Sequence, residues 1–111
     1  MEYYFIGERE LYLAFRLVGV PGAVANKKDD ALDAFLLMTG QSSKVSGPAE
    51  KDRPKVLILT EDVADMLETQ VVAWQKTGKT PLIVEVPGLQ GHLPGRKNLT
   101  DSIREALGIQ V

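Results

Sequence analysis

The chain contains no cysteine and only one histidine, His92, among its 111 residues. The absence of cysteine excludes disulfide bonds, thiolate zinc sites and thiol catalysis, and it fits a reducing compartment. A single imidazole does not make a zinc site, because such a site takes three or four ligands. His92 also lies in a stretch rich in glycine and proline, which is typical of a surface loop. We therefore expect no metal site.

Long apolar runs and blocks of like charge are missing as well. A membrane-spanning helix requires about 18 consecutive apolar residues, far more than any run in this chain. The N-terminus, "MEYYFIGERE", lacks the basic region of a signal peptide. The formal net charge is only -2, and no block of basic residues occurs, so a nucleic-acid partner is not expected. These absences favour a soluble, cytoplasmic protein without membrane insertion.

The chain also lacks the motifs that hold phosphates or catalyse hydrolysis. A dinucleotide site requires G-x-G-x-x-G after the first strand, so that backbone amides approach the pyrophosphate. Here "GERELYL" offers one glycine, and Glu8 and Glu10 would repel phosphate. Neither G-x-x-x-x-G-K-[ST] nor G-x-S-x-G occurs, so we interpret Ser42, Ser43 and Ser46 as polar loop residues. We expect no catalytic residue and no cofactor.

Four short apolar segments alternate with four segments of helical spacing. Strands are expected at 2–6, 22–25, 55–59 and 81–86, and helices over 8–18, from Asp29 or Asp30 to 39, 60–78 and 98–107. This alternation predicts right-handed crossovers and a parallel sheet with helices on both faces. The fold class is therefore α/β: a small doubly wound, flavodoxin-like (Rossmann-like) sheet of four strands in the order 2-1-3-4, with a C-terminal amphipathic helix.

Each predicted helix has one apolar stripe at positions i, i+3, i+4 and i+7. Trp74 follows this spacing, so we interpret it as a core residue and not as a platform for a cofactor. The polar stretch 41–54, rich in serine, glycine and proline, predicts a long exposed loop. The stripes comprise Leu11, Ala14, Phe15 and Val18; Leu32, Phe35 and Leu36; Val63, Met66, Leu67, Gln70, Val71 and Trp74.

The chain divides into an α/β sandwich, residues 1–88, and a glycine-rich linker with a C-terminal helix, residues 89–111. The last helix carries a further apolar stripe that includes Leu99, Ile103 and Leu107. Such a helix either closes the core of its own domain or docks into a groove on another protein. The sequence leaves both possibilities open.

The junction after the third strand, "TEDVADMLE", has two interpretations. Thr60 is a good N-cap, and Glu61 and Asp62 complement the helix dipole, which favours a simple helix start. The alternative is a receiver-like signalling domain with a phosphoacceptor acid, which requires an Asp at the strand end and a Lys after a later strand. Asp62 already lies inside the helix, and "VEVPG" ends the fourth strand without a lysine. A small-ligand enzyme on the same scaffold is a third, weaker hypothesis.

Four segments together resemble one protein family, in order and over nearly the whole chain. They are "FIGERELYLAFRLVGV" at 5–20, "VLILTEDVADML" at 56–67, "PLIVEVPG" at 81–88 and "SIREALGI" at 102–109. This pattern resembles the F subunit of the V-type and archaeal-type (A-type) rotary ATPases and ATP synthases. The chain departs from the family at Ala14, where glycine is more frequent, and in the loops 41–54 and 89–97.

The resemblance implies a non-catalytic subunit of the central stalk, or rotor. Members bind the coiled-coil D subunit inside the catalytic hexamer of A and B subunits, while ATP binds elsewhere and rotation is coupled to ion transport. The C-terminal segment faces partners and meets the hexamer transiently. By this analogy the partner interface includes Ile103, Leu107, Ile109 and Val111, with Glu61 and Asp62 exposed toward basic residues of the D subunit.

Overall fold

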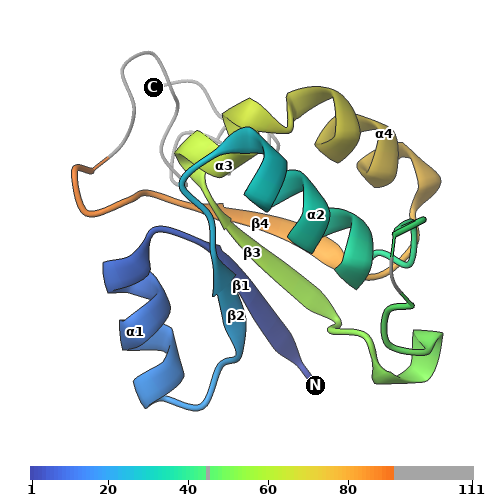
Figure 1. The fold of residues 1–111 in the computed structure, drawn as a ribbon, viewed down its shortest axis with the longest axis horizontal. Coiled ribbons are helices and arrows are strands. Elements are labelled where there is room, and N and C mark those ends of the chain that lie inside the picture. Colours follow the sequence, from blue (N-terminus) through green and yellow to red (C-terminus); the bar gives the residue numbers. More distant parts are fainter. Residues whose placement is uncertain (45, 92–111) are drawn as a thin grey trace, which may run out of the picture.

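Four parallel strands form one sheet in the order β2-β1-β3-β4 (Figure 1). The computed structural model describes residues 1–44 and 46–91. The predicted α/β fold and strand order are confirmed, and the predicted C-terminal helix lies outside the described residues. The strands are β1 (Tyr3–Gly7), β2 (Gly22–Val24), β3 (Val56–Thr60) and β4 (Leu82–Val86).

The helices cover the two faces of the sheet unequally. Among the elements in residues 1–44 and 46–91, one face carries α1 (Arg9–Leu17) alone, and the other carries α2 (Lys28–Met38), α3 (Glu61–Met66) and α4 (Glu68–Thr77) (Figure 1). Successive strand residues point to opposite faces. The ring of Phe5 therefore faces α1, where it stacks on Phe15 with the ring centroids 4.8 Å apart. Ile6 faces the three-helix side and joins the core there.

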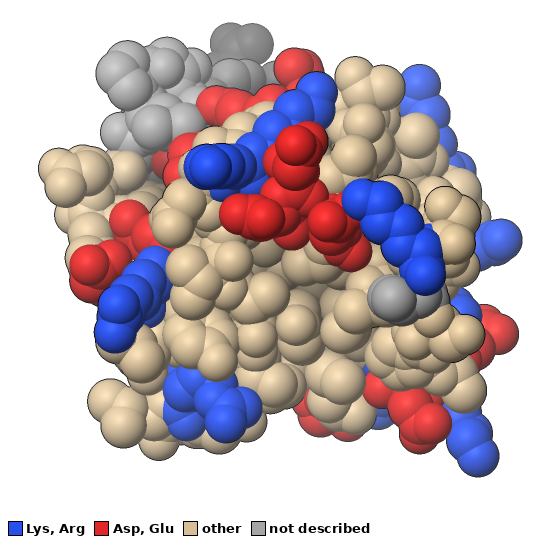
Figure 2. All heavy atoms as spheres, viewed as in Figure 1, with Lys and Arg blue, Asp and Glu red and all other residues tan. Residues whose placement is uncertain are grey.

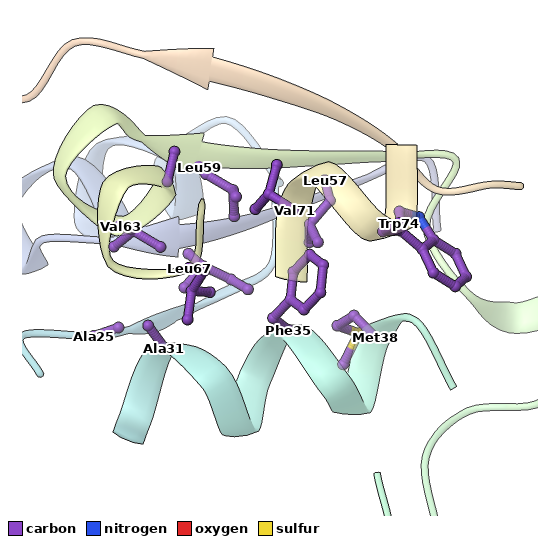
Figure 3. Close-up of a cluster of buried hydrophobic side chains, with 12 residues drawn as sticks. Ala25, Ala31, Phe35, Met38, Leu57, Leu59, Val63, Leu67, Val71 and Trp74 are labelled. Carbon is purple, nitrogen blue, oxygen red and sulfur yellow. The ribbon is translucent and has the colours of Figure 1, made fainter. Parts of the chain in front are cut away.

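The main hydrophobic core fills the space between the sheet and the three helices (Figure 3). Phe35 and Leu57 are fully buried within it, and Trp74 is also buried, which confirms that Trp74 is a core residue. The buried residues of α2 are Ala31, Phe35 and Met38, whereas Leu32 and Leu36 of the predicted stripe are only half-buried. The labelled cluster comprises Ala25, Ala31, Phe35, Met38, Leu57, Leu59, Val63, Leu67, Val71 and Trp74.

The single helix predicted over 60–78 is broken at Leu67. This residue has φ -108° and ψ 22°, and it separates α3 from α4. Hydrogen bonds continue across the break, from the Leu67 amide to the Val63 carbonyl at 3.0 Å and from the Val71 amide to the Leu67 carbonyl at 2.8 Å. The apolar stripe is therefore preserved, and Leu67 remains fully buried.

Of two predicted N-caps, that of α2 is wrong and that of α3 is confirmed in position. Lys27 takes the N-cap position of α2, so that Asp29 and Asp30 lie in the first turn, where the helix dipole favours carboxylates. Thr60 does occupy the N-cap position of α3, but its side chain makes no capping hydrogen bond. The predicted stop at Gly78 is confirmed, because its φ of 68° is the left-handed conformation that glycine adopts without strain.

The predicted apolar stripe of α1 is also wrong in part. Val18 is 76% exposed and Ala14 is exposed, so neither contributes to a buried face. Leu11 and Phe15 of the predicted stripe are half-buried, Tyr12 is half-buried beside them, and α1 has no fully buried residue. The reason is geometrical: α1 lies against β1 and β2 alone and is not enclosed by a second helix among the described elements.

Candidate partner interface

The carboxyl ends of the strands, where ligands bind in open α/β sheets, are packed here by the protein's own side chains. A Cβ atom added to Gly7 would lie 2.5 Å from Thr60 Cγ2 and 2.6 Å from Phe5 Cζ, so only glycine fits at this strand end. Thr60 is fully buried, and its Oγ1 has no hydrogen-bond partner among the described residues. The space beside Gly7 therefore serves packing.

Glu8 ties the end of β4 to the end of β1. The Leu89 amide donates a hydrogen bond to Glu8 Oε1 at 2.6 Å, across 81 residues of sequence. The turn that presents this amide is closed by a hydrogen bond of 2.9 Å from the Gly91 amide to the Gly88 carbonyl. A Cβ atom on Gly88 would lie 2.9 Å from Glu8 Oε1, so a larger residue would crowd this contact. After β4 the chain thus turns back across the end of β3.

Glu61 and Asp62, the two acids of the junction, have different surroundings. Both lie in the first turn of α3, where they complement the helix dipole. Asp62 is exposed as expected, but Glu61 is only 4% exposed, so its expected exposure is wrong. Glu61 lies at the end of the central strand β3, between β1 and β4, where neighbouring strands leave little access to solvent. Contact of either acid with a partner stays a prediction.

The remaining predicted interface residues lie outside the described part of the chain. They are Ile103, Leu107, Ile109 and Val111, and His92 lies outside it too. Their role in an interface therefore stays a prediction. The division into residues 1–88 and 89–111 also stays a prediction, although residues 88–91 form a turn that Glu8 holds against the sheet.

Several exposed apolar residues were not predicted from the sequence. Leu17 is 88% exposed next to Val18 at the end of α1, and Leu82 and Val84 of β4 are exposed on the sheet. Isolated exposed apolar residues are ordinary, but a contiguous group marks an interaction surface. The sequence did carry a sign of this exposed group: Leu82 and Val84 are two residues apart in β4, so their side chains lie on the same face of the sheet.

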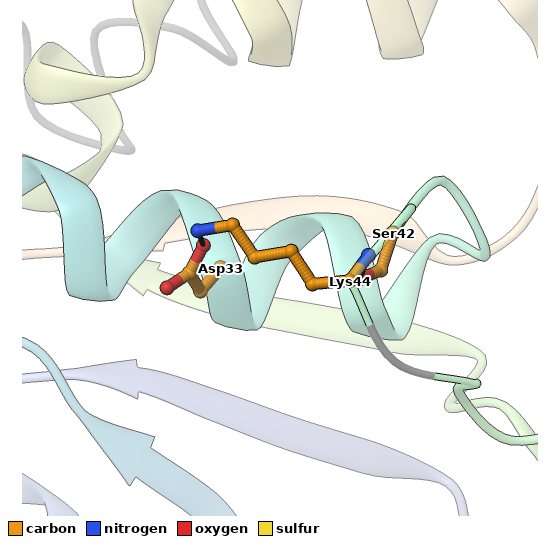
Figure 4. Close-up of polar contacts among 3 residues, drawn as sticks. All are labelled: Asp33, Ser42 and Lys44. Atoms are coloured by element: carbon orange, nitrogen blue, oxygen red, sulfur yellow. Dashed lines mark hydrogen bonds and ion pairs between the residues drawn. The ribbon is translucent and has the colours of Figure 1, made fainter.

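The loop 41–54 is fastened to α2. Lys44 Nζ lies 3.1 Å from Asp33 Oδ1, and the Lys44 amide donates to Ser42 Oγ at 3.3 Å (Figure 4). Within the loop, Arg53 Nε donates to the Pro48 carbonyl at 3.2 Å. The loop also contains a short 3-10 turn at Glu50–Asp52.

A shallow hollow of about 420 Å³ lies between β2 and α2. The face seen in Figure 2 shows a broad uncharged area bordered by a mixture of acidic and basic side chains. Burial raises the pKa of Tyr4, which lines the hollow, and the nearby Tyr12 raises it further. The hollow is lined by Tyr4, Ala23, Val24, Asp30, Asp33, Ala34, Leu37, Ser42 and Lys44.

Residues 1–44 and 46–91 contain neither a metal-binding cluster nor a membrane-spanning helix. In that part of the chain, no three histidine, aspartate or glutamate side chains are grouped as a metal site would require. None of the helices described there has the length and apolarity to cross a membrane.

Comparison with known proteins identifies the family. The model of the family described as ATP synthase (F/14-kDa) subunit matches residues 4–106. The chain belongs to this family. The resemblance noted from the sequence is thereby confirmed, and as a member of the family the chain is a subunit of an ATP synthase complex.

Curated F subunits of A-type ATP synthases are similar to this chain over almost their full lengths. The F subunit of Thermococcus kodakarensis is 29% identical over 106 residues, which cover 96% of this chain and 93% of that protein. That of Thermococcus sibiricus is 25% identical over 111 residues, covering 100% and 98%. That of Thermoplasma acidophilum is 25% identical over 109 residues, covering 96% and 90%.

Proposed function

We propose that the chain is the non-catalytic F subunit of the central stalk of a V-type/A-type ATPase. In this role it binds the coiled-coil D subunit and helps to couple ATP hydrolysis or synthesis to rotation and ion transport. The observation that carries the proposal is the family match over residues 4–106, together with the nearly complete coverage of the curated relatives. Its location would be cytoplasmic and peripheral, in the sector of the enzyme outside the membrane.

The edge of the sheet supports a role without catalysis by this chain. The segment after β1 is Gly7-Glu8-Arg9, where a nucleotide-binding sheet would place a glycine-rich loop. The Glu8 carboxylate lies where phosphates would bind, and it accepts a hydrogen bond from the Leu89 amide. A carboxylate at that position repels a phosphate, which agrees with ATP binding on other subunits.

The proposed contact with the D subunit uses the C-terminal segment, residues 89–111. Its apolar residues Ile103, Leu107, Ile109 and Val111 would be buried against the coiled coil. Buried apolar area contributes about 25 cal/mol per Å² before the entropy losses of association, so a few such residues dominate the affinity. The exposed Asp62 would meet basic residues of the D subunit, and such peripheral charges mainly set orientation and association rate. The same segment would contact the A and B subunits transiently.

Co-purification with the D subunit tests the proposal. The full chain should form a stable complex with this partner and should not hydrolyse ATP alone. Replacing Ile103 and Leu107 together by aspartate should weaken the complex at least about tenfold, because two charges would be buried without partners. The matched control is Ser102→Asp, which adds charge on the same segment but outside the apolar stripe. Equal affinity of the double variant and the control would refute the proposed interface.

The receiver-like alternative receives no specific support. Asp62 is the second residue of α3 and does not lie at the end of a strand. Incubation with acetyl phosphate and Mg²⁺, followed by intact mass measurement, separates the two functions. An adduct on the wild-type chain that is lost in Asp62→Asn would favour signalling, and an unchanged mass agrees with a stalk subunit.

A further inference from the structure

A second hollow, of about 360 Å³, lies between the end of α2 and the loop 41–54, next to the hollow between β2 and α2. Among the described residues that line it, the charged ones are Lys44 and Arg53, and both are basic. The hydroxyl groups of Ser42, Ser43 and Ser46 belong to the same lining. These five residues define the basic hollow. Cations and hydroxyl donors around one hollow favour a negatively charged ligand.

Arg53 is held in place at the basic hollow. Its Nε donates a hydrogen bond to the Pro48 carbonyl at 3.2 Å, and the residue is half-buried. A Cβ atom added to Gly40 would collide with the guanidinium carbon and both terminal nitrogens, so the guanidinium lies against the Gly40 backbone. A guanidinium has five N–H donors in a fixed fork, and Pro48 uses one of them. The terminal nitrogens are therefore preorganised for an anion, because little side-chain entropy remains to be lost.

Lys44 provides the second cation and is held less firmly. Its Nζ lies 3.1 Å from Asp33 Oδ1 on α2 (Figure 4). Both side chains of this ion pair are exposed, Lys44 by 76% and Asp33 by 53%, so solvent screens their attraction. Asp33 itself is not part of the lining of the basic hollow. An anion in the hollow therefore competes with a weakly bound carboxylate for the Lys44 ammonium.

We propose that the basic hollow binds a compact oxyanion of the phosphate type. The fork of Arg53 donates to two of its oxygens, the serine hydroxyl groups donate to others, and Lys44 turns from Asp33 to supply a second positive charge. A planar guanidinium matches the geometry of phosphate in this bidentate way. The base of a nucleotide finds no stacking surface, because none of the described lining residues is aromatic. The bound anion joins Arg53 to Lys44 and holds the loop 41–54 on the end of α2.

Titration of the isotope-labelled full chain with orthophosphate, followed by amide NMR spectra, tests the inference. Sodium chloride keeps the ionic strength constant, because screening alone shifts the resonances near exposed charges. The amides of Gly40 and Ser42 should shift and saturate in the millimolar range, as expected for charges open to solvent. Arg53→Gln should weaken binding at least about tenfold, since it removes charge-assisted hydrogen bonds. Lys51→Gln, which removes an exposed cation of the same loop outside the hollow, should leave the affinity unchanged. Shifts that do not saturate, or equal affinities of these two variants, would overturn the inference.

Two further variants separate an electrostatic role of Lys44 from a structural one. Lys44→Gln and Asp33→Asn break the same ion pair, so a purely structural role would change the affinity in the same direction. We expect opposite directions: loss of the cation should weaken binding about two- to fivefold, and its release from Asp33 should strengthen binding about two- to fivefold. Asp29→Asn, at an exposed acid in the first turn of α2, is the control and should have a smaller effect. Weaker binding by Asp33→Asn, or an equal gain in Asp29→Asn, would overturn the inference.

Inorganic tripolyphosphate and ATP distinguish the possible sources of the phosphate group. Both carry a triphosphate, and only ATP adds a nucleoside. Equal affinities agree with a hollow that recognises the oxyanion alone, whereas tighter binding of ATP would assign the hollow to a nucleotide and overturn the inference. All these measurements use the free chain, so their outcome does not depend on whether the chain binds the D subunit.

Discussion

Truncation of Phe35 should remove a large part of the stability of this fold. Phe35 is fully buried at the centre of the cluster between α2 and the sheet. Loss of a buried phenyl ring costs about 3–5 kcal/mol, which combines the transfer free energy with the cavity left behind. A domain of this size has a free energy of unfolding of about 5–15 kcal/mol, so Phe35→Ala removes at least about a fifth of it.

Urea unfolding measures this effect through the fluorescence of Trp74, the one tryptophan of the chain, which lies in the same cluster. For a slope of about 1.5 kcal/mol per M, Phe35→Ala should lower the midpoint by about 2–3 M. Leu17→Ala, at a residue 88% exposed, is the control and should change the free energy by less than about 0.5 kcal/mol. A Phe35→Ala midpoint within about 0.5 M of the wild type would refute the position of the core.

Three further predictions concern single contacts. Trp74→Phe removes the hydrogen bond of 2.9 Å from Trp74 Nε1 to the Pro81 carbonyl, and circular dichroism in urea should show a loss of about 1–2 kcal/mol. Burial raises the pKa of Tyr4, so the folded state favours the neutral phenol; the wild type should lose stability as pH rises through about 10, and Tyr4→Phe should lose less. Glu8→Ala removes the acceptor of the Leu89 amide, and hydrogen exchange there should accelerate while β3 stays protected. Unchanged exchange at Leu89 would contradict the role of Glu8.

The sheet was predictable because its signals are local. The run "KVLIL" is uninterrupted and apolar, which identified β3, and the stripe from Val63 to Trp74 identified the face that α3 and α4 bury. The break at Leu67 was not predictable, since neither glycine nor proline marks it. The error in the stripe of α1 at Ala14 and Val18 has a different cause: the same periodicity fits several faces, and the tertiary contact of Phe15 with Phe5 selects one.

The structure around Glu8 and Glu61 at the carboxyl ends of the strands depends on long-range contacts, which the periodicity of the sequence does not reveal. The bond between Glu8 and Leu89 joins residues 81 positions apart. The burial of Glu61 follows from the central position of β3, and a glutamate at a helix start is otherwise expected in solvent. The exposure of Tyr3 and Leu82 on one face of the sheet became visible only with the register, which aligns both residues with Val56. The family itself was recognisable because its segments keep their order.

The unequal covering of the sheet has a consequence for how the molecule unfolds. The three-helix layer shares one continuous cluster, whereas α1 rests on two strands with no fully buried residue. Mild heating should therefore detach α1 while the remaining layers are intact, and it should accelerate tryptic cleavage at Arg9 and Arg16. Among the described elements, local opening should begin at α1, and the three-helix layer should determine the temperature at which the domain melts.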